Sequence, residues 1–218
     1  MGSHHRKIHM INKKKIGAPR ILGAVILILL VLGLSLVSAG CSNGSGGQTQ
    51  KPSPLAAYEK ADMSGYGCMD EYTKDTVFVD VTMEDIDKLM QSKETFVLYA
   101  GFANCPWCNA LLPRLNDVAL EEGATIAYLD TRKNPEWKSN VDIDGYDKFK
   151  EYFGEYLDID DSGEPHLYVP DTYFIKEGEV VFHHQGVTPG LANPNDEWTK
   201  DLIKEAETTL KEGFDKLK

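Results

Sequence analysis

Beyond its first forty residues, the chain has no cluster of basic residues. Six of its 23 lysines and arginines precede Cys41, and no acidic residue occurs before Glu59. The remaining 17 basic residues are set against 34 acidic ones, so the chain from Cys41 onward carries a net charge of −17. Such a surface repels nucleic acid and anionic lipid headgroups. We therefore expect no nucleic-acid partner, and a membrane attachment would need lipid or an apolar segment.

A second C-x-x-C pair is also missing. The four cysteines are Cys41, Cys68, Cys105 and Cys108. A zinc site would need a further cysteine pair or two histidines at ligand spacing. His183 and His184 are adjacent instead, and on a strand they would point to opposite faces. This composition disfavours zinc, and we predict no metal site and no cofactor.

The first forty residues have the pattern of an export signal. Basic residues precede the uncharged run Ile21–Val37, which is followed by Ser38-Ala39-Gly40-Cys41. A basic region, an apolar region and small residues in this order are typical of a secretory signal. The cysteine after the small residues resembles a bacterial lipoprotein signal, which implies cleavage before Cys41 and a diacylglycerol on its sulfur. The alternative is an uncleaved anchor, because the apolar run approaches the length of a spanning helix.

These signals divide the chain into three parts. Residues 1–40 form the signal peptide, whose first five residues are either a tag remnant or the native start. Residues 41–57 form the lipid anchor and a flexible linker rich in glycine, serine and proline. Residues 58–218 form the folded domain. Either form of anchor places this domain at the cell membrane, on the extracytoplasmic face.

Within the domain, strand and helix patterns alternate. Predicted strands at 77–81, 95–101 and 125–130 are separated by helices at 82–92 and after Cys105. Residues 131–169 interrupt the alternation and contain a helical segment near 146–157 and an acidic turn at 158–164. A hairpin with its turn at 176–178 and a final helix at 197–217 complete the order β-α-β-α-β-α-β-β-α. This is the order of the thioredoxin fold: an α/β protein with a mixed central sheet flanked by helices, here with an insertion after the third strand.

Cys105-Pro106-Trp107-Cys108 lies at a predicted strand-to-helix junction. There the N–H groups and the dipole of the helix stabilise a thiolate on the first cysteine. Cys105 is therefore the predicted nucleophile, and Cys108, one turn further, would resolve the mixed disulfide that Cys105 forms. We expect Trp107 to be exposed beside Cys105 and to offer an apolar face to a partner chain.

From about Asp75 to its end, the chain resembles the thioredoxin-like thiol–disulfide oxidoreductases. The shared features are the Cys105/Cys108 pair, Pro113, Val169-Pro170 before a strand, and Gly186 after the last strand. The resemblance implies that Pro170 is a cis-proline beside the cysteines and that Val169 presents its backbone N–H and C=O to an extended substrate. The chain is most similar to lipid-anchored proteins of this kind from Gram-positive bacteria, including bacteriocin-transport accessory proteins.

One departure from that pattern concerns proton transfer. Thioredoxin has a buried acid six residues before its first cysteine, and Tyr99 stands at this position. Tyr99 is then either a core aromatic residue or a hydroxyl group near Cys108. Because Pro106-Trp107 replaces Gly-Pro, and the intervening residues tune the potential, the direction of electron flow does not follow from the resemblance.

The sequence thus predicts a membrane-tethered enzyme, a thiol–disulfide oxidoreductase. Its expected partners are the thiols and disulfides of exported proteins and a membrane electron donor or acceptor. The alternative is a non-catalytic module, either copper-binding or a secretion accessory, since copper chaperones on this fold add a distant histidine to a cysteine pair. His166, His183 and His184 would be the candidate ligands. Cys68 is left as a buried thiol, an intermolecular partner or a partner of the active pair.

Overall fold

The structure is a computed structural model that describes residues 53–72, 75–132, 141 and 143–218. The predicted signal, Cys41 and most of the linker lie outside these residues. Among the helices described, none is long and apolar enough to cross a membrane. The packed core includes Leu55, which is fully buried two residues before the predicted end of the linker.

Five strands form a mixed central sheet. In spatial order they are β1 (Phe78–Asp80), β3 (Ile126–Asp130), β2 (Phe96–Gly101), β6 (Asp171–Lys176) and β7 (Glu179–Gln185). β3 pairs in parallel with β1 and β2, whereas β6 is antiparallel to both β2 and β7. This order and these directions are those of thioredoxin, which confirms the predicted fold class.

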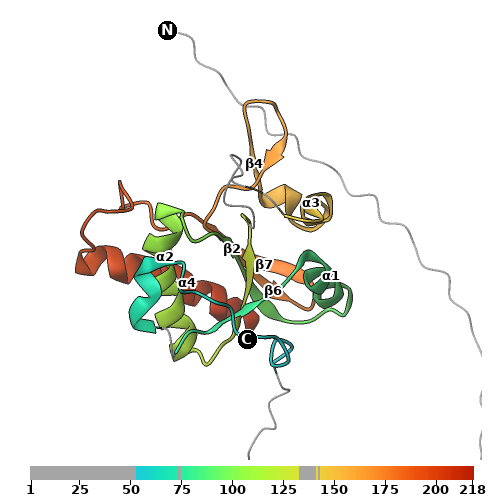
Figure 1. The fold of residues 1–218 in the computed structure, drawn as a ribbon, viewed down its shortest axis with the longest axis horizontal. Coiled ribbons are helices and arrows are strands. Elements are labelled where there is room, and N and C mark those ends of the chain that lie inside the picture. Colours follow the sequence, from blue (N-terminus) through green and yellow to red (C-terminus); the bar gives the residue numbers. More distant parts are fainter. Residues whose placement is uncertain (1–52, 73–74, 133–140, 142) are drawn as a thin grey trace, which may run out of the picture. The chain divides into compact units, whose positions relative to one another are not determined.

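Helices cover both faces of this sheet (Figure 1). The α-helices are α1 (Met83–Gln91), α2 (Pro106–Glu121), α3 (Tyr146–Phe153) and α4 (Lys200–Leu217), and the 3₁₀ helices are η1 (Gly67–Tyr72) and η2 (Gly154–Tyr156). Residues of α2, α4 and η1 form one buried cluster, and residues of α1 and α3 form the other. Successive residues of the fully buried strand β2 enter the two clusters alternately, because side chains of a strand point to opposite faces in turn.

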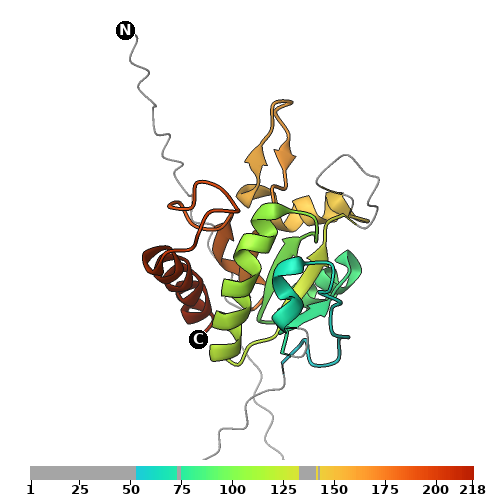
Figure 2. The same cartoon turned by 60° about the vertical axis from the view of Figure 1, so that its left-hand side comes forward.

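The insertion between β3 and β6 holds two strands that the sequence did not predict. β4 (Asp158–Ile159) and β5 (Pro165–His166) form an antiparallel hairpin where we expected an acidic turn. The Asp160 carboxylate organises this turn, since it accepts hydrogen bonds from the backbone N–H groups of Ser162 (2.8 Å) and Glu164 (3.2 Å). The hairpin extends beyond the end of the molecule at which α2 begins (Figure 2).

Two helix boundaries differ from the predicted ones. The last helix begins at Lys200 rather than at residue 197, because the Thr199 hydroxyl caps it by accepting a hydrogen bond from the Leu202 N–H at 3.3 Å. The helical segment predicted at 146–157 ends at Phe153 and continues as the single turn η2. Neither difference moves the elements that carry the cysteine pair.

Candidate active site

Cys105 occupies the N-cap position of α2, directly before Pro106. Its Sγ atom accepts a hydrogen bond from the Cys108 backbone N–H at 3.1 Å. Serine, threonine, aspartate and asparagine usually fill this position, because the first N–H groups of a helix have no partner within the helix. Here a sulfur atom receives that hydrogen bond, as the sequence predicted for a thiolate at the start of the helix.

The two cysteines of the pair differ strongly in acidity. The pKa of Cys105 is lowered, first by a hydrogen bond with the Cys108 side chain and then by the backbone N–H groups of Cys108 and Trp107, which together outweigh its burial. Burial in the core raises the pKa of Cys108 well above that of an ordinary thiol. Cys105 is therefore the thiol that ionises first, and Cys108 stays protonated behind it.

Arg132 supplies a positive charge to this site, and the sequence analysis did not identify it. Its guanidinium Cζ lies 4.2 Å from the centre of the Phe102 ring. Phe102 is fixed to the start of α2, since its carbonyl accepts the Cys105 N–H at 3.1 Å. The charge of Arg132 contributes to the lowered pKa of Cys105. Arg132 could have been identified from its position two residues after β3, because the carboxyl ends of parallel strands meet at one edge of the sheet.

Val169 and Pro170 lie against the pair. The peptide bond between them is cis, as predicted. The Val169 carbonyl accepts a hydrogen bond from Cys105 Sγ at 3.7 Å, so the backbone before β6 touches the Cys105 thiol directly. The antiparallel pairing of β6 with β2 brings this segment to the end of β2 from which the chain runs to Cys105.

Trp107 is half-buried and packs against the cluster on the α2 side of the sheet, so it is less exposed than we expected. Apolar surface is provided instead by the insertion. Tyr168 is 41% exposed and directly precedes Val169, and Ile159 on β4 is 63% exposed.

Cys68 lies on η1, close to the start of α2. Its backbone N–H donates a hydrogen bond to Asn109 Oδ1 at 3.4 Å, and Asn109 in turn donates to the Cys105 carbonyl at 3.0 Å. Cys68 and Pro106 line the same pocket. Burial raises the pKa of Cys68 to about 11, so this half-buried thiol is a poor nucleophile at neutral pH.

The histidines do not gather around the cysteines. His183 Nε2 lies 2.6 Å from Asp171 Oδ1, and His184 Nε2 lies 2.8 Å from the Val187 carbonyl oxygen. The His166 ring packs on Tyr168. In the part of the chain that the structure describes, no three histidine, cysteine or acidic side chains are arranged to hold a metal ion.

No protein-family profile and no curated protein matches the chain. The chain is similar to a solved structure described as "a putative oxidoreductase with a thioredoxin fold". The alignment covers 63% of this chain and 94% of that one, at 11% sequence identity and a TM-score of 0.40. Our fold assignment depends on the strand order and directions given above. The fold is that of thioredoxin.

The lowered pKa of Cys105 predicts selective alkylation. At pH 7 iodoacetamide should label Cys105 before Cys68 and Cys108, and the rate should rise with pH around a midpoint below the ordinary thiol value of about 8.5. Arg132→Gln should move this midpoint upward and slow labelling at pH 7 roughly twofold to fivefold, because a nearby cation favours the thiolate. The measurement is mass spectrometry of quenched samples.

Arg114→Gln is the matched control, because this arginine lies on α2 and pairs with Asp117 at 3.5 Å. We expect it to label like the unmodified chain. Equal labelling rates for Arg132→Gln and Arg114→Gln would show that the charge of Arg132 does not act on Cys105.

Proposed function

We propose that this protein is a membrane-tethered thiol–disulfide oxidoreductase that exchanges disulfides with exported polypeptides. The observation that carries the proposal is the contact between the Cys105 thiol, at the start of α2, and the Val169 carbonyl beside cis-Pro170. This contact places an ionisable sulfur atom against the backbone of the partly exposed Val169, and Cys108 lies one helical turn behind.

The pKa difference between the two thiols assigns their roles. The Cys105 thiolate attacks one sulfur of a substrate disulfide, and the other sulfur leaves with the electron pair and takes up a proton. Cys108 then loses its proton and attacks Cys105 Sγ, which breaks the mixed disulfide and releases the second substrate thiol. The substrate gains two electrons, and the protein is left with a Cys105–Cys108 disulfide. The reverse sequence oxidises a substrate dithiol.

The surface around Val169 supports a polypeptide as substrate. An extended chain that pairs with the Val169 backbone would pass the exposed side chain of Tyr168, which directly precedes Val169. The net charge of −17 from Cys41 onward would favour chains that carry basic residues near their cysteines. A free thiol of low molecular weight would use little of this surface.

The location outside the cytoplasm is supported by the predicted leader of residues 1–40, which ends before Cys41 and lies outside the described residues. An enzyme held at the membrane would meet exported chains as they emerge. A membrane electron donor or acceptor would then restore the pair after each turnover.

The full chain in mild detergent tests the proposal. We expect it to accelerate the reduction of a protein disulfide by dithiothreitol. In glutathione buffers, Cys105 and Cys108 should equilibrate between dithiol and disulfide as a single redox couple. A potential near about −270 mV would indicate a reductase, and one near about −120 mV an oxidase. The absence of both acceleration and a Cys105–Cys108 disulfide would refute the proposal.

A further inference from the structure

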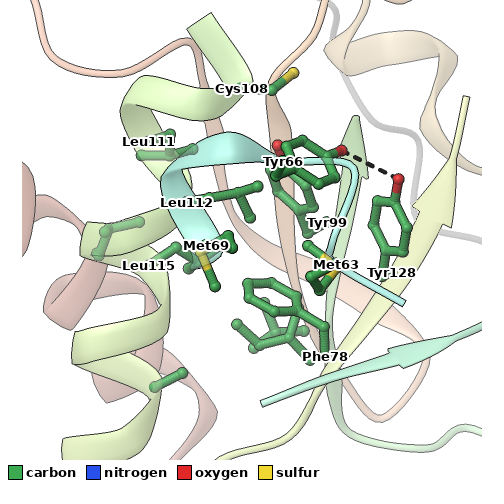
Figure 3. Close-up of a cluster of buried hydrophobic side chains, with 14 of the residues drawn as sticks. Met63, Tyr66, Met69, Phe78, Tyr99, Cys108, Leu111, Leu112, Leu115 and Tyr128 are labelled. Carbon is green, nitrogen blue, oxygen red and sulfur yellow. Dashed lines mark hydrogen bonds between the residues drawn. The ribbon is translucent and has the colours of Figure 1, made fainter. Parts of the chain in front are cut away.

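Tyr99 lies at the centre of β2, fully buried on the side of the sheet that α2 covers. Its hydroxyl group points along the strand toward the cysteine pair. A Cβ atom added to Gly101 would lie only 2.5 Å from the Tyr99 hydroxyl oxygen, so the side chain occupies the space that the glycine leaves. Figure 3 shows Tyr99 below the start of α2, at the end of the cluster where Cys108 lies.

The hydroxyl group of Tyr99 is buried, and among the described residues it has no hydrogen bond of standard geometry. The neighbouring tyrosines differ in this respect, because the hydroxyl groups of Tyr66 and Tyr128 are 3.1 Å apart and bond to each other (Figure 3). A buried hydroxyl without a partner costs about 1–3 kcal/mol. Packing does not explain this cost, since phenylalanine would fill the same space without a polar atom.

The Tyr99 hydroxyl lies close enough to Cys108 for each group to influence the other. Burial is the main reason why the pKa of Cys108 is raised, and the Tyr99 hydroxyl acts in the opposite direction by favouring the thiolate. In turn, a charge on Cys108 would raise the pKa of Tyr99, which burial already raises. The hydroxyl group therefore keeps its own proton, and toward a Cys108 thiolate it acts as a hydrogen-bond donor.

We propose that the Tyr99 hydroxyl donates a hydrogen bond to Cys108 Sγ while that sulfur resolves the mixed disulfide. This inference rests on the proposed function. In this step the Cys108 S–H bond breaks, a Cys105–Cys108 bond forms, and the bond between Cys105 and the substrate sulfur breaks. The substrate sulfur leaves with the electron pair and takes up the proton from Cys108, and Tyr99 remains neutral throughout.

A hydroxyl at this position acts differently from a carboxylate. A buried carboxylate could accept the Cys108 proton, but its negative charge would oppose a thiolate beside it. The neutral hydroxyl stabilises the thiolate without bringing a second charge into the core. Resolution would then depend on hydrogen-bond donation rather than on the titration of a neighbouring acid.

Tyr99→Phe in the full chain tests the inference, because it removes only the hydroxyl group. Single-turnover reactions quenched with acid separate the formation of the mixed disulfide from its resolution. We expect formation at the unmodified rate and resolution about tenfold to a hundredfold slower, the loss expected for one hydrogen bond to a charged group. The pH profile of resolution should also shift to higher pH, which loss of packing alone would not produce.

Tyr128→Phe is the matched control, since it removes a hydroxyl group of the same cluster that bonds to Tyr66 and not to a cysteine. It should resolve the mixed disulfide at the unmodified rate. If Tyr99→Phe fails to fold, 3-fluorotyrosine at position 99 replaces it, and this more acidic donor should speed resolution about twofold.

Unchanged resolution and an unchanged pH profile, in whichever of these two substitutions at position 99 is folded, would overturn the inference. That result differs from a failure of the proposed function, in which the unmodified chain would form no mixed disulfide at all.

Discussion

Cys105→Ser is expected to lower the turnover of a protein disulfide to the uncatalysed rate, a loss of about 10³-fold or more. A hydroxyl at the N-cap of α2 would still receive the Cys108 N–H, so the helix should begin as before. It cannot form a disulfide, however, and Cys108 is too deeply buried to replace it as the first nucleophile. The measurement is dithiothreitol-driven reduction of a protein disulfide, with circular dichroism to confirm the fold.

Two further serine variants make this prediction specific. In the Cys108→Ser variant, Cys105 should still attack the substrate disulfide, but the mixed disulfide on Cys105 should then persist. Non-reducing electrophoresis would detect it. Cys68→Ser removes a thiol of raised pKa near the same helix and should leave turnover unchanged. If activity survived in Cys105→Ser and disappeared in Cys68→Ser, the nucleophile would be Cys68, and our assignment of this role to Cys105 would be wrong.

The sequence was sufficient for those parts of the site that local spacing determines. Cys105 and Cys108 lie in one helical turn after a buried strand, so the strand and helix patterns alone placed them at a junction. Val169-Pro170 was identified through the resemblance, and its contact with Cys105 spans 64 positions of the chain. No periodicity in a single sequence predicts a contact of that separation.

The missed features depend on pairing between distant segments. Arg132 reaches the site because β3 lies beside β2, and its distance to Phe102 depends on how the chain leaves that strand. The β4–β5 hairpin consists of two residues on each side, too short for an alternating pattern to be recognised. For Tyr99 the sequence left two interpretations. Its full burial in the cluster on the α2 side confirms the core aromatic residue, and the action of its hydroxyl group on Cys108 is the inference proposed above.

Asp171 was not singled out by the sequence either, although it directly follows Pro170. Its carboxylate is fully buried on the face of the sheet away from the cysteines. Oδ2 accepts a hydrogen bond from the Tyr173 hydroxyl at 2.5 Å, and Oδ1 lies 2.6 Å from His183 Nε2. The His183 ring also stacks on Tyr173 at 4.8 Å between centroids, so all three side chains hold one another in place. This arrangement connects the first residue of β6 to β7.

Asp171→Ala is therefore expected to lower the free energy of unfolding by about 3–5 kcal/mol, because it leaves the Tyr173 hydroxyl without its acceptor and His183 Nε2 without its hydrogen-bond partner. Asp171→Asn is the matched control and should lose less, since its amide oxygen can still accept one of the two bonds. Urea unfolding followed by circular dichroism measures both variants. Equal stability of Asp171→Ala and the unmodified chain would show that the network contributes little to the fold.

The same variants separate stability from catalysis. Asp171 lies on the opposite face of the sheet from Cys105. A fully folded Asp171→Asn variant should therefore lose less than about tenfold in turnover, in contrast to Cys105→Ser. The loss that remains would come through Pro170, whose position beside the thiol depends on the residue that anchors β6. A folded Asp171→Asn variant as inactive as Cys105→Ser would instead place Asp171 in the reaction itself, a role that its contacts with Tyr173 and His183 do not support.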